Sequence, residues 1–170
     1  MIQAQLSGER VFSNSSEAFS LFEKSCFGEK KEHKIDYSPV EALFLVSEKK
    51  MRVFSGKKEL DEEALSKKLA KSDKKIMTKS MVYSDMRKKG YVLKTALKYG
   101  ADFRVYEKGV KPGEAHARWV LFAIKEKDAI DWKEFVAKNR IAHSIKKNLL
   151  IGIVDEEGDV SYYEVSWTKP

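Results

Sequence analysis

The chain has 170 residues, a length that suits one ordinary domain or two small ones. Hydrophobic residues make up 42% of the chain and charged residues 35%, which is typical of a soluble globular protein and excludes a largely disordered one. No apolar run approaches the ~18 residues of a membrane-spanning helix, and the N-terminus lacks the basic and apolar segments of a signal peptide. We therefore expect a protein that does not enter the membrane.

The net charge and the cysteine content indicate what the protein can bind and in which compartment it works. Lys and Arg number 33 against 26 Asp and Glu, so the formal net charge is +7. A Lys- and Glu-rich surface of the kind found in heat-adapted proteins accounts for this balance, and so does binding to a polyanion such as nucleic acid; charge alone does not separate the two interpretations. The single cysteine, Cys26, allows no internal disulfide and fits a reducing cytoplasm.

The first half of the chain alternates short strands and helices. Residues 38–41, Ser-Pro-Val-Glu, predict a helix start, because Ser suits the N-cap, Pro the first helical position and Glu the third. Residues 28–34 are polar and rich in Lys, and they predict a loop. The other elements predicted here are two strands within 1–13 around the turn Ser7-Gly8, a helix at 16–22, a strand at 51–54 and a helix that begins at 60.

A longer helix is predicted from about residue 72 to residue 89, where three basic residues and a following glycine provide the usual C-terminal chemistry. The Lys-rich segment before it is the best domain boundary, which we place at residue 75. The elements predicted after it are strands at 91–94, 101–106, 117–124, 149–154 and 160–167, a turn at 98–100, a loop at 109–113, a helix at 131–145 and a hairpin turn at 155–159. The result is an α+β protein, with a small N-terminal α+β domain at 1–75 and a domain at 76–170 whose central mixed or antiparallel sheet is flanked by helices.

The usual signatures of metal and nucleotide sites are absent from the sequence. The three histidines, His33, His116 and His143, are far apart, Cys26 stands alone, and no C-x-x-C or H-E-x-x-H spacing occurs. No P-loop, G-x-G-x-x-G or G-x-S-x-G motif occurs either. We therefore expect no metal and no cofactor.

Polar residues near strand ends in the second half are the remaining candidates. In the stretch KYGADFRVYEKG, strand alternation puts Asp102, Arg104 and Tyr106 on one face and leaves the apolar residues between them for the core. His116 follows a Gly- and Pro-containing loop, and Lys147 precedes a buried-type strand. Taken singly, each of these is more often an ordinary packed or surface residue, but adjacent strands can bring their ends together.

Three segments in this order, YVLKTALKYGADFRVYEKG, HARWVLFAI and RIAHSIKKNLLIGIVDEEGD, resemble the archaeal tRNA-splicing endonuclease (tRNA-intron endonuclease) family. The resemblance covers most of residues 76–170, and the block K-Y-G-A-D-F-x-x-Y is its most specific part. The N-terminal half matches more loosely, through SPVEALFLV. The resemblance implies an RNA endonuclease that excises introns from precursor tRNA at bulge-helix-bulge sites without a metal, leaving 2′,3′-cyclic phosphate and 5′-hydroxyl ends.

The resemblance also implies a role for each of the three candidates. Tyr106, in the block after G-A-D-F, matches the family's general base, and His116, after the next loop, matches its general acid. Lys147 matches the residue that stabilises the charged phosphate. These residue types suit the reaction, because the 2′-hydroxyl of RNA is itself the nucleophile, histidine transfers protons near neutral pH, and lysine is a compact cation for phosphate oxygens.

Other positions are expected to bind RNA by the same resemblance. Arg140 matches an arginine that stacks on a bulged base, and Lys146 fills a basic position before the catalytic lysine. Some members complete this base clamp with a second arginine in the final strand, where this chain offers aromatic residues, Trp167 among them. Arg104 is expected to hold its strand or meet phosphate, and His143 to support the site.

The family works as a multimer, because two cuts need two active sites, and an acidic loop docks in a basic cleft of a neighbouring subunit. By resemblance the turn DEEGD is that loop, with the acidic residues Asp155, Glu156, Glu157 and Asp159; the alternative is a solvated hairpin turn. A chain with this loop and the full catalytic set favours a homotetramer over a heterotetramer with a structural subunit. Two other functional classes stay open: a non-catalytic RNA-binding or structural subunit of the same assembly, and an unrelated basic α+β binding protein.

Overall fold

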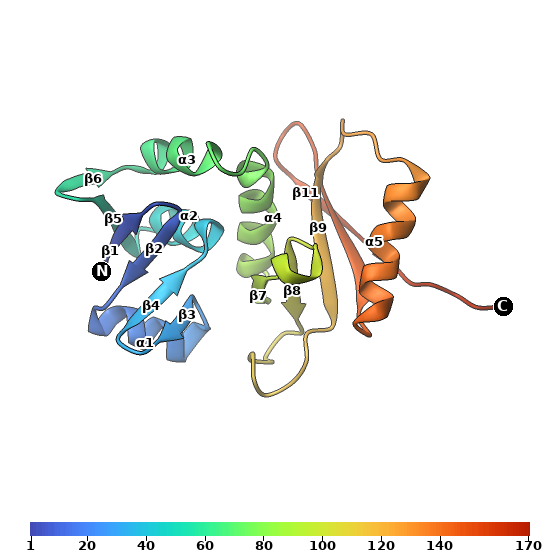
Figure 1. Ribbon diagram of the computed structural model, residues 1–170, viewed down its shortest axis with the longest axis horizontal. Helices are drawn as coiled ribbons and strands as arrows, with labels where there is room; N and C mark the ends of the chain where they lie inside the picture. The colour runs from blue at the N-terminus through green and yellow to red at the C-terminus, as the bar shows by residue number, and fades with distance from the viewer. The chain divides into compact units, whose positions relative to one another are not determined.

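The computed structural model describes residues 1–170, and the chain forms two compact units, Met1–Ser80 and Met81–Pro170. Together the units contain five α-helices and two mixed sheets (Figure 1), which confirms the α+β class predicted from the sequence. None of the helices has both the length and the apolar composition that crossing a membrane requires.

The first unit is built on a six-stranded sheet with the strand order β3-β4-β2-β1-β5-β6. Neighbouring strands are antiparallel except β1 and β5, which run parallel. The bounds are β1 Ile2–Ser7, β2 Arg10–Ser13, α1 Ser16–Ser25, β3 Glu29–Lys31, β4 Lys34–Tyr37, α2 Pro39–Ser47, β5 Met51–Ser55, β6 Lys58–Leu60 and α3 Glu62–Ala70, and α4, Ile76–Lys88, begins in this unit.

Alternating side chains give this sheet one buried and one exposed face. In β1, Ile2 and Ala4 are buried while Gln3 and Gln5 are exposed, as the two-residue period of a strand requires. Helix α1 packs against β3 and β4, and α2 packs against β2 and β5. The unit therefore has an apolar core on one side of its sheet and a polar sheet surface on the other.

Helix α2 begins with the capping box predicted from the sequence. The Glu41 N–H donates to the Ser38 hydroxyl, and the Glu41 carboxylate accepts from the Ser38 N–H at 2.9 Å. The same carboxylate, only 4% exposed, also accepts from the Gly28 N–H at 2.9 Å. Glu41 thereby ties the start of α2 to the segment that precedes β3.

The structure corrects two predictions for this unit. The segment 28–34 is not a loop but a hairpin of β3 and β4, in which Lys31 lies opposite Lys34. All three residues of β3 are exposed, as in many charged edge strands, so no apolar pattern distinguishes it from a loop. The longer helix starts at Ile76 rather than at residue 72, because the residues before it form turns in which the Asp73 carboxylate accepts a backbone N–H.

Gly28 allows the chain to turn from α1 into this hairpin. Its φ is +76°, and a Cβ at this position would lie 2.3 Å from Ile35 Cγ2 and 2.9 Å from the Asp36 carbonyl oxygen. Gly28→Ala adds the cost of a left-handed backbone to a clash with a strand. We therefore expect the free energy of unfolding of the first unit to fall by about 2–5 kcal/mol, as measured by urea denaturation.

Gly8→Ala is the matched control for this substitution. Gly8 has a similar φ of +61°, but nothing lies within 4 Å of its Cβ position. Only the conformational cost of about 1–2 kcal/mol then remains. Equal losses in the two variants would contradict the clash at Gly28.

The second unit contains a five-stranded sheet with the order β11-β10-β9-β8-β7, in which β9 and β10 are parallel and all other neighbours antiparallel. The bounds are β7 Val92–Thr95, the 3-10 turn η1 Leu97–Tyr99, β8 Phe103–Tyr106, β9 Trp119–Lys125, α5 Trp132–Ser144, β10 Asn148–Val154 and β11 Val160–Val165. The strands and the helix predicted for this half are confirmed, with ends that differ by one or two residues.

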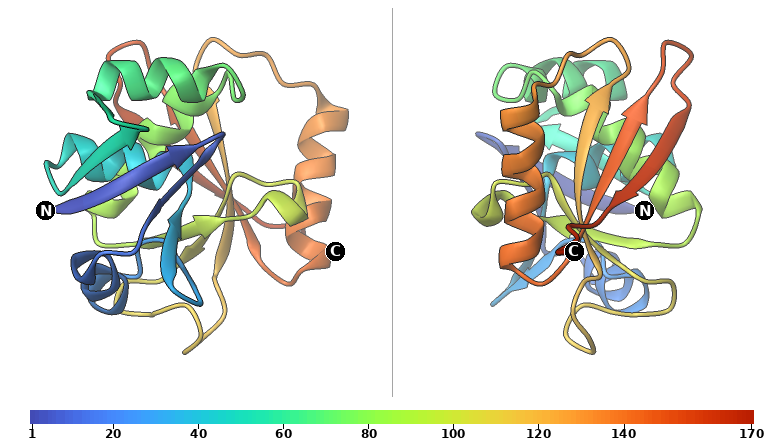
Figure 2. Two further views of the ribbon diagram at one scale, coloured as in Figure 1. Left: turned by 60° about the vertical axis from the view of Figure 1, so that its left-hand side comes forward. Right: turned by 90° about the vertical axis from the view of Figure 1, so that its right-hand side faces the viewer.

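A helix covers each face of this sheet (Figures 1 and 2). On one face α5 contributes Ala142 to a core cluster that includes Val120 of β9. On the other face lie the α4 residues of this unit, where the Tyr83 ring is 5.8 Å from the Phe103 ring of β8. Gly152 of β10 has no side chain at the point where α4 comes close to the sheet. The sheet is therefore the central layer of this unit, with a helix packed on each face.

Strand directions decide where the polar strand ends meet. Because β8 is antiparallel to β9 and β9 is parallel to β10, the carboxyl end of β8 and the amino ends of β9 and β10 share one edge of the sheet. Val105 pairs with Trp119, and Trp119 pairs with Asn148. The next residues outward, Tyr106 and Lys147, therefore lie at the same edge.

Candidate active site

A pocket of about 320 Å³ opens at this edge of the second sheet. It is lined by residues of η1, β8, the loop after β8 and the segment before β10, namely Tyr99, Arg104, Tyr106, Gly113, Glu114, Ala115, His116, Ala117 and Lys147. The pocket thus brings together the tyrosine, the histidine and the lysine that the sequence singled out. No three His, Cys, Asp or Glu side chains of the chain gather into a group that could hold a metal ion.

Tyr106 is held by the strand that it ends. It is 5% exposed, and its neighbour Val105 is fully buried on the opposite face of β8. Phe103, two residues before Val105, is buried on that same opposite face. The strand therefore fixes the tyrosine at the pocket wall through its own packing.

His116 lies at the end of a loop that is ordered by hydrogen bonds between Lys111 and Glu114. The Lys111 N–H donates to the Glu114 carboxylate at 3.3 Å, and the Glu114 N–H donates to the Lys111 carbonyl at 3.1 Å. Directly after the exposed histidine, Ala117 is buried again. The loop therefore presents His116 to the pocket just before the chain returns to the sheet.

Lys147 enters the pocket from the end of α5. Lys146 has a φ of +55°, and the N–H groups of both lysines donate to carbonyls of the last turn of α5 at 3.0 and 2.9 Å, which ends the helix. The Lys147 Nζ donates to the Ala117 carbonyl oxygen at 2.7 Å. Because Ala117 directly follows His116, this bond holds the lysine beside the histidine loop.

Arg104 and Asp102 share a face of β8 with the tyrosine but have different surroundings. Arg104 lines the pocket, and its Nε donates to the Thr95 carbonyl at 3.3 Å. The Asp102 carboxylate accepts from the Ala123 N–H of β9 at 2.8 Å. Asp102 therefore ties two strands together, whereas Arg104 adds a cation to the pocket wall.

Three of the expected RNA contacts lie outside the pocket, at the C-terminal end of α5. Arg140 and Lys146 are exposed there. The Trp167 ring, 59% exposed, lies 4.8 Å from the imidazole of His143 in the last turn of α5. The end of the chain thus adds an aromatic ring to a cationic surface.

The final strand directs another aromatic residue away from this surface. Tyr162 lies on the α4 face of the sheet, where its hydroxyl donates to the Asp85 carboxylate at 2.7 Å. Burial, and secondly this hydrogen bond, raise the pKa of Tyr162. Lys89 pairs with the same carboxylate at 2.5 Å. Tyr162 therefore fastens β11 to α4, whereas Trp167 lies beside the last turn of α5.

The acidic turn at 155–159 is ordered by its first residue. The Asp155 carboxylate accepts from the N–H groups of Glu157 and Asp159 at 3.0 and 2.8 Å. Glu156, Glu157 and Asp159 are exposed. The turn is thus a fixed loop that presents negative charge to the solvent.

Two known domain families match this chain, one in each half. Residues 76–162 match the tRNA intron endonuclease catalytic C-terminal domain, and residues 2–66 match the tRNA intron endonuclease N-terminal domain. The chain belongs to the tRNA intron endonuclease family.

Relatives of this tRNA intron endonuclease match it over its whole length. A tRNA-splicing endonuclease of Thermococcus kodakarensis is 38% identical over 170 residues, which cover 99% of each chain. One of Thermococcus onnurineus is 37% identical over 169 residues, which cover 99% of this chain and 97% of the relative. One of Methanothermobacter thermautotrophicus is 35% identical over 170 residues, which cover 99% of each. Membership of this family makes the chain an endoribonuclease and supports a function as a tRNA-splicing endonuclease.

The pocket of this tRNA intron endonuclease contains a residue that the sequence did not single out. Tyr99 is half-buried in η1, and the Lys98 amine lies 4.9 Å from its ring centroid. Tyr99 belongs to the block K-Y-G-A-D-F that carries the family resemblance, so a signal was present. Its place in the pocket depends on the turn between β7 and β8, which the local pattern does not specify.

A polar network supports the edge of the sheet on which the pocket lies. The Trp119 Nε1 donates to one Glu164 oxygen at 3.0 Å, and the Asn148 amide donates to the other. These bonds, the one from Trp119 first, lower the pKa of Glu164. Because Trp119 and Asn148 begin β9 and β10, Glu164 fixes the strand ends next to the pocket.

Proposed function

We propose that this endonuclease excises introns from precursor tRNA by cutting bulge-helix-bulge sites without a metal ion, leaving 2′,3′-cyclic phosphate and 5′-hydroxyl ends. The observation that carries the proposal is that Tyr106, His116 and Lys147 line one and the same pocket. A proton acceptor, a proton donor and a cation are the groups that cleavage by the 2′-hydroxyl of RNA requires.

In the proposed reaction the 2′-hydroxyl next to the scissile phosphate is the nucleophile. Tyr106, reacting as its phenolate, accepts the proton of this hydroxyl and becomes a neutral phenol as the 2′ oxygen forms a bond to phosphorus. The bond from phosphorus to the 5′ oxygen breaks, and His116 donates the proton that this leaving oxygen takes up. Lys147 stabilises the negative charge that develops on the other phosphate oxygens. Its bond to the Ala117 carbonyl supports this role, because it keeps the ammonium group beside the histidine loop.

The cations and the ring around the pocket are proposed to hold the RNA. Arg104, on the pocket wall, is placed to bind a phosphate next to the cleaved one. Arg140 and Lys146 form the exposed cationic end of α5, and we propose that Trp167 stacks on the opposite side of a bulged base from Arg140. Arginine planes and aromatic rings both stack on unpaired bases, which supports this pairing.

The direct test is cleavage of a bulge-helix-bulge RNA by the purified chain in excess EDTA. We expect cutting at both bulges, with 2′,3′-cyclic phosphate ends that alkaline phosphatase leaves intact. The same RNA with its bulges closed by base pairing is the control, and it should stay whole. A requirement for an added divalent metal would contradict the proposed mechanism.

We further propose that the chain acts in the cytoplasm as a homotetramer, with its domains at residues 1–75 and 76–170. The ordered, exposed acidic loop supports an assembly in which Asp155, Glu156, Glu157 and Asp159 dock on a basic surface of a neighbouring subunit. Light scattering of the purified chain measures the subunit count. Cleavage that appears only after a second protein is added would favour a heterotetramer, and a chain that binds RNA without ever cutting would be a structural subunit.

A further inference from the structure

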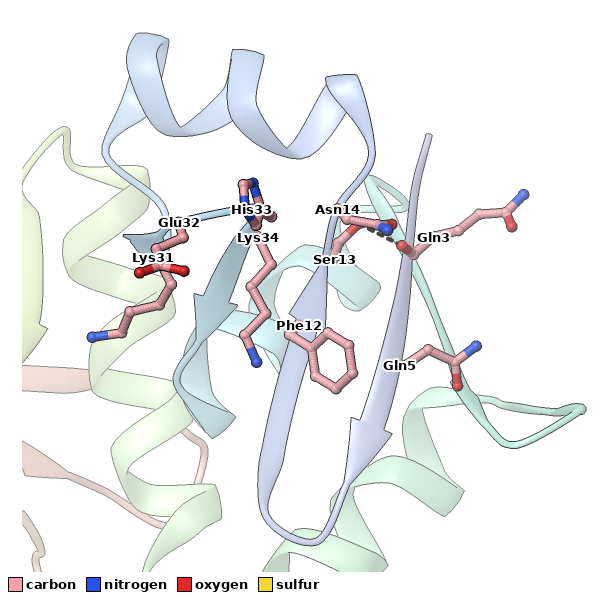
Figure 3. Close-up of a pocket in the computed structure, with 9 residues that line it drawn as sticks. All are labelled: Gln3, Gln5, Phe12, Ser13, Asn14, Lys31, Glu32, His33 and Lys34. Carbon is pink, nitrogen blue, oxygen red and sulfur yellow. Dashed lines mark hydrogen bonds between the residues drawn. The ribbon is translucent and has the colours of Figure 1, made fainter.

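The first unit contains a groove that the proposed cleavage does not use. It has a volume of about 670 Å³ and lies on the exposed face of the six-stranded sheet, among residues of β1, β2 and the β3–β4 hairpin (Figure 3). We propose that this groove binds an unpaired stretch of RNA. The RNA is identified as precursor tRNA through the proposed function, whereas its unpaired state follows from the side chains of the groove.

Amide side chains make up part of the groove. Gln3, Gln5 and Asn14 line it, and their amides make no hydrogen bond within the chain. The hydrogen bond drawn in Figure 3 uses the backbone of Gln3 and not its amide side chain. In it the Ser13 hydroxyl donates to the Gln3 carbonyl oxygen at 2.6 Å. Each free amide offers donors and an acceptor, the groups that pair with the edges of unpaired bases.

Two phenylalanine rings stand on this same face. Gln5 of β1 lies opposite Phe12 of β2 on one side and Phe54 of β5 on the other. Both rings are half-exposed, although a sheet face that meets solvent is normally polar. Because neighbouring strands lie ~4.8 Å apart, the two rings stand roughly 10 Å apart. Aromatic rings on an open sheet are a known platform on which single-stranded RNA stacks its bases.

Lysines supply the positive charge of the groove. The Lys34 side chain lies beside the Phe12 ring (Figure 3). Its Nζ is 4.5 Å from the centroid of that ring and 3.4 Å from the Asp36 carboxylate. Lys31, its cross-strand neighbour, lies 3.6 Å from the Glu29 carboxylate. Ion pairs at such a surface are weak and screened by salt, so phosphates can replace these carboxylates.

The combination of groups favours RNA over other occupants. The centre of a protein–protein interface is normally depleted of lysine, whereas Lys34 lies over the ring in this groove. A small anion would use the lysines but neither the amides nor the rings. Single-stranded RNA has a use for all three, because phosphates take the lysines, bases stack on rings, and base edges bond to amides.

Removal of both lysines tests the proposal in the full chain. We expect Lys31→Ala with Lys34→Ala to raise the Kd three- to tenfold for precursor tRNA with 2′-deoxy residues at its cleavage sites, which stays uncut. The Kd for an unstructured oligouridylate of about 12 nucleotides should rise equally, as measured by fluorescence anisotropy. The slope of log K against log salt should fall by about 1–2, since up to two phosphate contacts are lost.

The matched control removes two lysines of the same unit that lie outside the groove. Lys67→Ala with Lys68→Ala changes the net charge by the same amount. Lys67 forms an ion pair with Glu63, just as Lys31 forms one with Glu29. Affinity and salt slope should stay at the wild-type values in this control. Equal affinities of the two double variants for both RNAs would overturn the proposal.

Gln5→Glu gives a second test that does not depend on the lysine variant. It keeps the shape of the side chain but puts a carboxylate between the two rings, and we expect about tenfold weaker binding of the oligouridylate. Wild-type affinity of this variant for the oligouridylate would overturn the proposal. A change in the mass of the assembly with unchanged RNA binding would overturn it too, because a second copy of the chain would then occupy the groove. Failure of wild-type cleavage in EDTA with these binding effects intact would contradict the proposed function and leave the groove assignment standing.

Discussion

His116→Ala is expected to slow the cleavage of precursor tRNA by about a hundredfold to ten-thousandfold while its affinity for the RNA stays within about threefold of wild type. A positioned general acid contributes a factor of this size, because without it the 5′ oxygen leaves as an alkoxide. His116 is exposed in the pocket, so its removal should not disturb the core. Single-turnover cleavage with enzyme in excess measures the chemical step. Filter binding to an RNA with 2′-deoxy residues at both cleavage sites, which lacks the nucleophile, measures the affinity.

A substrate with sulfur in place of the leaving 5′ oxygen isolates the proton donation. A thiolate leaves without a proton, so His116→Ala and the wild-type chain should cut this RNA at similar rates. Lys147→Ala is the control, and sulfur should not rescue it, because the charge on phosphorus oxygens still needs a cation. If His116→Ala remains slow on the sulfur substrate, the histidine is not the acid.

The pocket could largely be predicted because its polar residues end apolar runs. Tyr106 closes the strand that begins at Phe103, and Lys147 directly precedes the buried strand β10. Once neighbouring strands are assigned, these ends must meet at one edge. The sequence could not predict the bond from Lys147 to the Ala117 carbonyl, because that bond depends on the backbone path of the loop after β8.

Local sequence patterns also do not show which face of the sheet a strand side chain occupies. Alternation alone puts Tyr162 and Tyr163 on opposite faces of β11, but only the positions of α4 and α5 decide which face carries the pocket. The bond from Tyr162 to Asp85 settles that Tyr162 faces α4. The edge strands of the first unit are a similar case, since β3 is charged throughout and gains its structure from pairing with β4. The start of α2, which Ser38 caps, was predicted correctly because the signal of its capping box is local.

Lys147→Ala is expected to slow the cleavage of precursor tRNA by about a hundredfold to a thousandfold, an effect similar in size to that of His116→Ala. Loss of one preorganised donor to a developing negative charge costs this much in other enzymes. The affinity for RNA should fall only a few-fold, since one phosphate contact is removed. Lys133→Ala, which removes an exposed lysine of α5, is the matched control and should cleave like the wild type. Wild-type cleavage by Lys147→Ala would contradict the proposed mechanism.

Lys147→Arg separates charge from position. The ammonium group has three N–H donors, of which one is used by the Ala117 carbonyl and two remain for phosphate oxygens. A guanidinium keeps the charge but is planar and longer, so it does not hold one donor on Ala117 and another at the phosphate in the same geometry. We expect Lys147→Arg to cleave about tenfold more slowly than the wild type, at a rate between those of the wild-type chain and Lys147→Ala. Full activity in Lys147→Arg would show that charge alone suffices, and that the bond to Ala117 serves the fold of the loop rather than the placement of the cation.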